Sequence, residues 1–62
     1  MPTRIEDCEA KVETDSALLV DIDGDEVWVP KSVIHDDSEV YEKGHEGTLV
    51  VESWWARKKG YE

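Results

Sequence analysis

The sequence predicts a mainly β domain, built from four or five short antiparallel strands and a short C-terminal helix. Three observations predict it: the chain has only 62 residues, several segments alternate apolar and polar side chains, and an Asp-Gly pair separates two of those segments. A chain of this length buries only about 60% of the surface that it exposes when unfolded. We therefore expect residues 1–62 to form one small domain with one thin core.

The first two strands are predicted from alternation alone. Residues 7–13 and 16–22 each place apolar side chains at every second position, as a half-buried strand requires. Thr14-Asp15 supplies the turn between them. The side chains expected to face inward are Cys8, Ala10 and Val12 in the first strand and Leu18, Val20 and Ile22 in the second.

A hairpin is predicted at Asp23-Gly24, because a tight turn that matches strand twist needs residues that tolerate positive φ. The third strand then covers residues 26–29. A two-residue loop would place Leu18 opposite Val29 and Val20 opposite Val27, and a four-residue loop would keep the same faces inward. In both cases Trp28 points to the opposite face, which also carries Leu19.

The second half of the chain is punctuated by proline, glycine and serine. Pro30 ends the third strand, since it cannot donate a hydrogen bond to a ladder, and residues 31–34 form one helical turn. A brief strand is expected at Val40 and Tyr41, and a longer one over 48–52. Further expectations for the C-terminus are a helix over 54–59 with Ser53 as its N-cap, Gly60 at its end, and Tyr61 packed back onto Ala56.

We expect the strands to curl into an SH3-like or OB-like barrel, because closing the sheet removes the exposed edges that invite aggregation. An open sheet with a helix across one face is the alternative. The helix is expected to lay one of Trp54 and Trp55 over the sheet near Leu19 and Trp28, which would close one end of the barrel. The alternative is an exposed aromatic side chain left for a partner.

Composition limits the class of protein. The 16 acidic and 7 basic residues give a formal net charge of -9. Cys8 is the sole cysteine, so no internal disulfide can form, and the start of the chain lacks the apolar run of a signal peptide. We therefore expect a cytoplasmic protein that does not enter a membrane.

Catalytic and metal chemistry are not indicated. The run from Asp21 to Glu26 has the carboxylates of a calcium loop, but an EF-hand would need Gly and Glu where Glu26 and Ser32 stand. Cys8, His35 and His45 lack the paired spacing of a zinc site. Acidic neighbours also disfavour a thiolate at Cys8. We expect no enzyme activity, no metal and no cofactor.

Two segments carry a resemblance: DGDEVWVPKS at 23–32 and EGTLVVESWWARKKG at 46–60. They resemble short acidic proteins of phages, prophages and bacterial genomes, which are often encoded near replication or recombination genes. The resemblance implies a bacterial or phage cytosol. It implies no activity and carries no catalytic residue to this chain.

These observations predict a phage-type or prophage-type accessory protein that acts as a non-catalytic, acidic protein-interaction module. Its partner would be another protein with a basic surface, such as one that binds nucleic acid. The alternatives are weak binding of single-stranded nucleic acid through exposed tryptophans and the basic residues 57–59, and self-association. The candidate binding residues are Trp28, Trp54, Trp55, Asp21, Asp23, Asp25 and Glu26.

Overall fold

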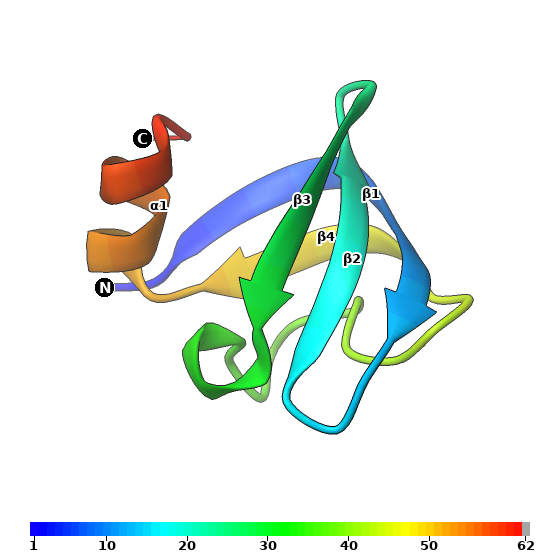
Figure 1. The fold of residues 1–62 in the computed structure, drawn as a ribbon. Helices are drawn as coiled ribbons and strands as arrows, with labels where there is room; N and C mark the ends of the chain where they lie inside the picture. Colours follow the sequence, from blue (N-terminus) through cyan, green and yellow to red (C-terminus); the bar gives the residue numbers. More distant parts are fainter. Residues whose placement is uncertain (62) are drawn as a thin grey trace.

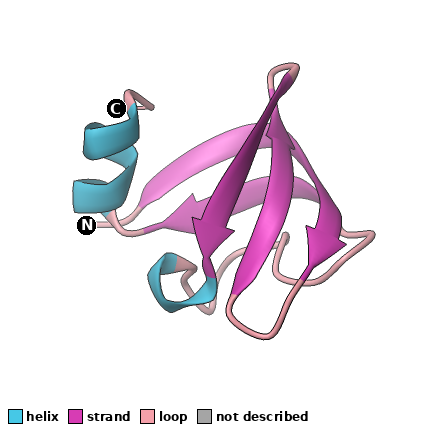
Figure 2. Cartoon of the chain, viewed as in Figure 1, coloured by secondary structure: helices cyan, strands magenta, loops and turns pink. Residues whose placement is uncertain are grey.

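A four-stranded antiparallel sheet in the order β3-β2-β1-β4 makes up most of the computed structural model, which describes residues 1–61 (Figures 1 and 2). This confirms a mainly β fold with a short C-terminal helix. The sheet is not closed, because β3 and β4 lie at its two ends, and the choice between an SH3-like and an OB-like barrel stays a prediction. The elements are β1 (Thr3–Glu13), β2 (Ala17–Ile22), β3 (Asp25–Pro30), the 3-10 helix η1 (Lys31–Val33), β4 (Glu46–Val51) and α1 (Ser53–Lys59).

The β2–β3 hairpin has a two-residue loop, one of the two lengths that the sequence allowed, with Leu18 opposite Val29 and Val20 opposite Val27. Asp23 and Gly24 have φ of 57° and 92°, the positive values that let a tight turn follow the twist of its strands. The Asp21 carboxylate accepts a hydrogen bond of 3.0 Å from the Gly24 N–H. Local chemistry therefore fixes both the turn and the register of this hairpin.

Strand β1 begins earlier than predicted and contains two bulges. It pairs with β4 through residues 3–9 and with β2 through residues 8–13, so it joins the two halves of the sheet. One extra residue interrupts the pairing with β4 between Ile5 and Cys8, where Asp7 has a φ of 60°. A second bulge interrupts the pairing with β2 between Ala10 and Val12. Bulges bend a strand and increase its twist, which accounts for the curl of β1 in Figure 1.

The second bulge corrects the prediction for Val12. Strict alternation placed Val12 inward with Ala10, but Lys11 is the extra residue at the bulge, so Val12 turns to the opposite face. Val12 is 42% exposed, whereas Ala10 is buried. Cys8, Leu18, Val20, Ile22 and Val29 are buried as predicted, and Val27 packs against them half-buried.

Helix α1 packs against the core on the inner side of the sheet through Trp55 and Ala56. The helix therefore does not lie over Leu19 and Trp28, which are on the outer side. Ser53 is its first residue rather than its N-cap, and the Ser53 hydroxyl hydrogen-bonds with Met1 and Thr3 near the N-terminus (Figure 1). Gly60 ends the helix in the left-handed conformation, as predicted, and Tyr61 stacks on Trp55.

The connection between η1 and β4 contains turns and bends but no strand, so the expected strand at Val40 and Tyr41 is wrong. Val40 is nevertheless fully buried, because the Ser38 hydroxyl bonds both its N–H and its C=O. Hydrogen bonds link residues 35–39 to β4, and Ile34 forms an isolated bridge with Val51. This connection thus covers the free edge of β4.

Candidate functional site

The outer face of the sheet, opposite the core, carries an apolar row across three strands. Val12 of β1 lies opposite Leu19 of β2, and Leu19 lies opposite Trp28 of β3. Val12 is 42% and Trp28 50% exposed, while Leu19 is half-buried between them. We call these three side chains the apolar row. The row exists because the Lys11 bulge turns Val12 outward.

An acidic row crosses the same face on all four strands. Glu46 of β4 lies opposite Glu9 of β1, Glu9 opposite Asp21 of β2, and Asp21 opposite Glu26 of β3. Like charges directly opposite each other in a sheet are destabilising. We call these four residues the acidic row. Their alignment opposes folding, so it concentrates negative charge on this face at a cost in stability.

Lys11 lies beside the acidic row. Its ammonium is 3.2 Å from the Glu9 carboxylate. The hydrogen bond to Glu9 raises the pKa of Lys11, and the charges of Asp21 and Glu26 act in the same direction. Lys11 can offset one of the four carboxylates, and the row as a whole remains negative.

The two rows are adjacent. Leu19 and Asp21 are two residues apart on β2, as are Trp28 and Glu26 on β3, a separation of about 7 Å along each strand. One lysine or arginine side chain of a partner can reach a carboxylate while its stem covers the apolar row. The outer face therefore offers negative charge beside an exposed indole.

The other predicted site residues do not join this face. Asp23 lies at the tip of the hairpin, and Asp25 alternates to the inner side. Burial raises the pKa of Tyr61, and the charge of Asp25 raises it further. Trp54 is 57% exposed, but it lies on α1. Trp55 is 3% exposed, with its ring centroid 6.4 Å from that of Tyr61, so it is a core residue and presents no surface to a partner.

Sequence reasoning missed Val12, Glu9 and Glu46 as members of this surface. The two-residue loop already implies that Asp21 and Glu26 are opposite each other, so this part of the acidic row was open to prediction. The rest depends on the registers of β1 with β2 and β4 and on the two bulges. Those pairings join residues far apart in sequence and leave no local signal.

The cysteine and the two histidines each contact a different group. Cys8 is 2% exposed, and its thiol donates to the Ile5 carbonyl at 3.3 Å. His35 is 2.7 Å from the Glu52 carboxylate, and His45 makes an edge contact with Tyr41. Among residues 1–61, no three His, Cys, Asp or Glu side chains are grouped so as to hold a metal ion.

Burial should make Cys8 a probe of local opening. Burial raises the pKa of the Cys8 thiol, and the charges of Asp7 and Asp21 raise it further. We expect iodoacetamide at pH 8 to alkylate Cys8 about 10²–10⁴-fold more slowly in the native protein than in urea, given a stability of about 3–5 kcal/mol. Mass spectrometry follows the alkylation of Cys8 over time. Equal rates in the native protein and in urea would contradict a buried thiol.

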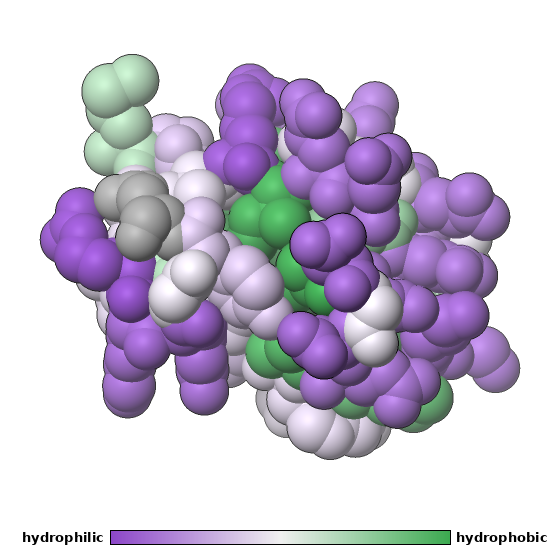
Figure 3. Space-filling model, turned by 90° about the horizontal axis from the view of Figure 1, so that it is seen from above, coloured by the Kyte–Doolittle hydropathy of each residue, from purple (hydrophilic) through white to green (hydrophobic). Residues whose placement is uncertain are grey.

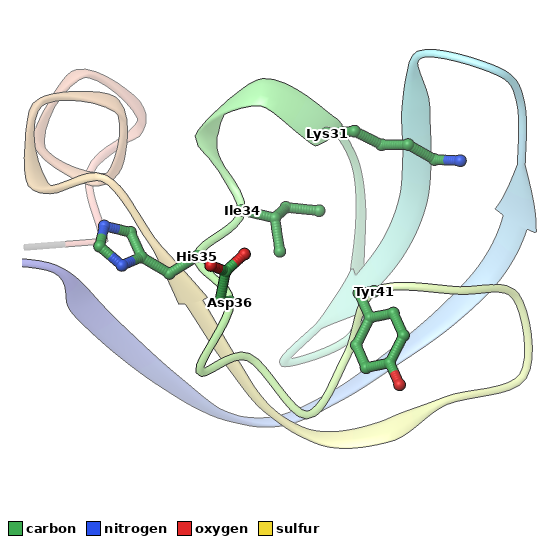
Figure 4. A pocket seen from close by; sticks show the side chains of 5 residues that line it. All are labelled: Lys31, Ile34, His35, Asp36 and Tyr41. Atoms are coloured by element: carbon green, nitrogen blue, oxygen red, sulfur yellow. The ribbon is translucent and has the colours of Figure 1, made fainter.

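A pocket of about 360 Å³ lies on another side of the molecule and is lined by Lys31, Ile34, His35, Asp36 and Tyr41 (Figure 4). In Figure 4, Lys31 and His35 extend in opposite directions from Ile34. Two of the polar groups are engaged elsewhere: Lys31 bonds the Glu13 carboxylate at 2.6 Å, and His35 bonds Glu52. Lys31 and His35 are therefore each already paired with a carboxylate.

Most of the surface seen from above is hydrophilic, with apolar atoms gathered in its middle (Figure 3). Within residues 1–61, no helix has both the length and the apolar character needed to span a bilayer. Comparison with protein-family models, curated proteins and solved structures finds no match.

Proposed function

We propose that this protein is a non-catalytic interaction module whose outer face binds a basic segment of another protein. The observation that carries the proposal is the adjacency of the apolar row, with the exposed Trp28, to the acidic row. Tryptophan is among the commonest residues to anchor protein interfaces. A face that pairs tryptophan with aligned carboxylates fits a partner rich in lysine or arginine.

Two physical effects favour such a partner. A cation placed over the face of Trp28 is attracted by the indole ring, by about 0.5–2 kcal/mol. A cation between Asp21 and Glu26 also relieves the repulsion between these opposed carboxylates. The net charge of -9 would speed association with a basic protein and make it sensitive to salt.

The resemblance to short acidic phage and prophage proteins leads us to propose a cytoplasmic accessory role. A basic protein that binds nucleic acid would fit the outer face, because carboxylates along a strand can occupy a site for phosphates. Self-association through this face would align two negative surfaces, which disfavours it.

Direct binding of single-stranded nucleic acid is the second candidate function. It is supported by the exposure of Trp54 on the same helix as Arg57, Lys58 and Lys59. The two other tryptophans do not support it, since Trp28 lies beside the acidic row and Trp55 is buried. Binding by one indole and three basic residues would be weak.

The proposal is tested by NMR titration of the whole chain with an eight-residue peptide of alternating lysine and valine, at low salt. We expect shifts at Val12, Leu19 and Trp28, and loss of at least tenfold in affinity, about 1.4 kcal/mol, in Trp28→Ala. An acidic peptide of alternating glutamate and valine should not bind. Shifts confined to Trp54 and α1 would contradict the proposal.

Two matched variants separate the contributions of the indole and the charge. Trp54→Ala removes an equally exposed tryptophan from outside the face and should leave affinity unchanged. Glu26→Gln should weaken binding yet raise the free energy of unfolding by about 0.2–1 kcal/mol, because it removes one like-charge pair. A single-stranded oligonucleotide, titrated in parallel, should perturb Trp54 rather than Trp28 if the second candidate function holds.

A further inference from the structure

The two edges of the sheet are protected unequally. On β4, the connection covers the edge: the His35 N–H donates to Val50 at 2.8 Å, and the Glu39 N–H to Thr48 at 3.0 Å. In return, the Thr48 N–H donates to the Glu39 carboxylate at 2.9 Å and the Val50 N–H to the Ser38 hydroxyl at 3.1 Å. No segment within residues 1–61 makes comparable backbone hydrogen bonds along the outer edge of β3.

The register of the hairpin determines which groups of β3 face outward. In a two-residue hairpin the residues that flank the loop, Ile22 and Asp25, form a hydrogen-bonded pair, and hydrogen-bonded pairs then alternate. Glu26 and Trp28 belong to non-hydrogen-bonded pairs with β2, so their N–H and C=O groups point away from β2. Within residues 1–61, no backbone hydrogen bond from another segment reaches Glu26 or Trp28.

Pro30 and Lys31 agree with this alternation. Pro30, which has no N–H, occupies an outward-pointing position, and the Lys31 N–H, one position further, donates back to Ser16 at 2.8 Å. The open edge therefore spans Glu26 to Trp28 and ends at Pro30. It offers two N–H and two C=O groups to an added strand.

We propose that the basic segment binds as an added strand along β3, pairing with the backbone of Glu26 and Trp28. This inference rests on the proposed function and specifies its geometry. An added strand extends both rows of the outer face, because alternate side chains of that strand lie beside Glu26 and Trp28. A lysine or arginine opposite Glu26 would end the acidic row with a positive charge, which favours pairing.

Charge selects this occupant over a second copy of the chain. Asp25 and Glu26 stand at the start of the open edge, and acidic residues at an edge oppose pairing with another acidic strand. Two chains of net charge -9 repel each other as they approach. A basic segment is instead attracted, so the same residues that block self-pairing favour this partner.

The test uses the whole chain and three forms of the lysine–valine peptide. One is unmodified, one carries a methyl group on the backbone nitrogen of each of its four lysines, and one carries it on the backbone nitrogen of each of its four valines. In an added strand only one of these alternate sets directs its N–H groups at β3. We expect one methylated peptide to lose binding and the other to retain it. At a peptide concentration ten times Kd, amide exchange at Glu26 and Trp28 should slow about tenfold.

The outcomes separate this inference from the proposed function. Equal binding of all three peptides, with shifts still on the outer face, would overturn strand addition and leave the proposed function standing. Failure of every peptide to bind at 1 mM, roughly the limit of measurable affinity, would overturn both. Slow exchange at Glu26 and Trp28 in the free protein, together with a dimeric mass, would mean that a second copy already occupies the edge, and would also overturn the inference.

Discussion

Trp55→Ala is expected to leave much of the protein unfolded at 25 °C. Trp55 is 3% exposed and packs with Ala56 against the core, and Tyr61 stacks on it. Truncating a buried tryptophan costs about 3–5 kcal/mol. A 62-residue chain that cannot form an internal disulfide has a total stability of about the same size, 3–5 kcal/mol. Circular dichroism and urea titration should therefore show a lost or strongly shifted transition.

Trp54→Ala is the matched control, since it removes the same side chain one position earlier in the same helix. Trp54 is 57% exposed, and surface substitutions usually change stability by about 0.5 kcal/mol or less. We expect its urea midpoint to stay close to that of the original chain. Equal destabilisation by the two substitutions would contradict the orientation of α1.

Ser38→Ala is expected to lower the free energy of unfolding by about 2–3 kcal/mol. The buried Ser38 hydroxyl donates to the Val40 carbonyl at 2.8 Å and accepts from the N–H groups of Val40 at 3.2 Å and Val50 at 3.1 Å. Alanine would leave these three backbone groups without that partner, in a part of the molecule where Val40 and Val50 are fully buried. Urea denaturation followed by tryptophan fluorescence measures the loss.

Ser32→Ala provides the comparison for Ser38. Ser32 is exposed on η1, so its substitution should change the free energy of unfolding by no more than about 0.5 kcal/mol. The amide of Val50 should also exchange faster in Ser38→Ala than in Ser32→Ala, because the connection would be released from the edge of β4. Similar midpoints for both variants would mean that Ser38 does not hold this connection.

Some side chains stabilise the fold, and others remain exposed for binding. Trp55 and Ser38 hold the helix and the connection to the sheet, while Trp28 is left at the surface. The acidic row lowers the free energy of unfolding of a chain whose total stability is small. Removing the Glu26 carboxylate should therefore improve folding and impair binding, a pair of effects that a purely solvating charge would not produce.

Local pattern determined much of the fold. Alternation identified Leu18, Val20 and Ile22 as core residues, and Asp23-Gly24 specified a tight turn that keeps Val27 and Val29 on the same face. Both succeed because strand faces and turn conformations depend on residues close together in sequence. The same reasoning correctly predicted that Trp28 points outward and that the helix ends at Gly60.

The amino-acid sequence by itself thus determined the hairpin, the faces of its strands and the acidic charge of the chain. Tertiary structure alone decided that Val12 turns outward at a bulge, that Trp55 rather than Trp54 is buried, and that Glu46 and Glu9 align with Asp21 and Glu26. The physical reason is that bulges and strand order arise when residues distant in sequence pair to satisfy backbone hydrogen bonds. Such pairing leaves no periodic trace in either strand, and it is what assembles the binding surface.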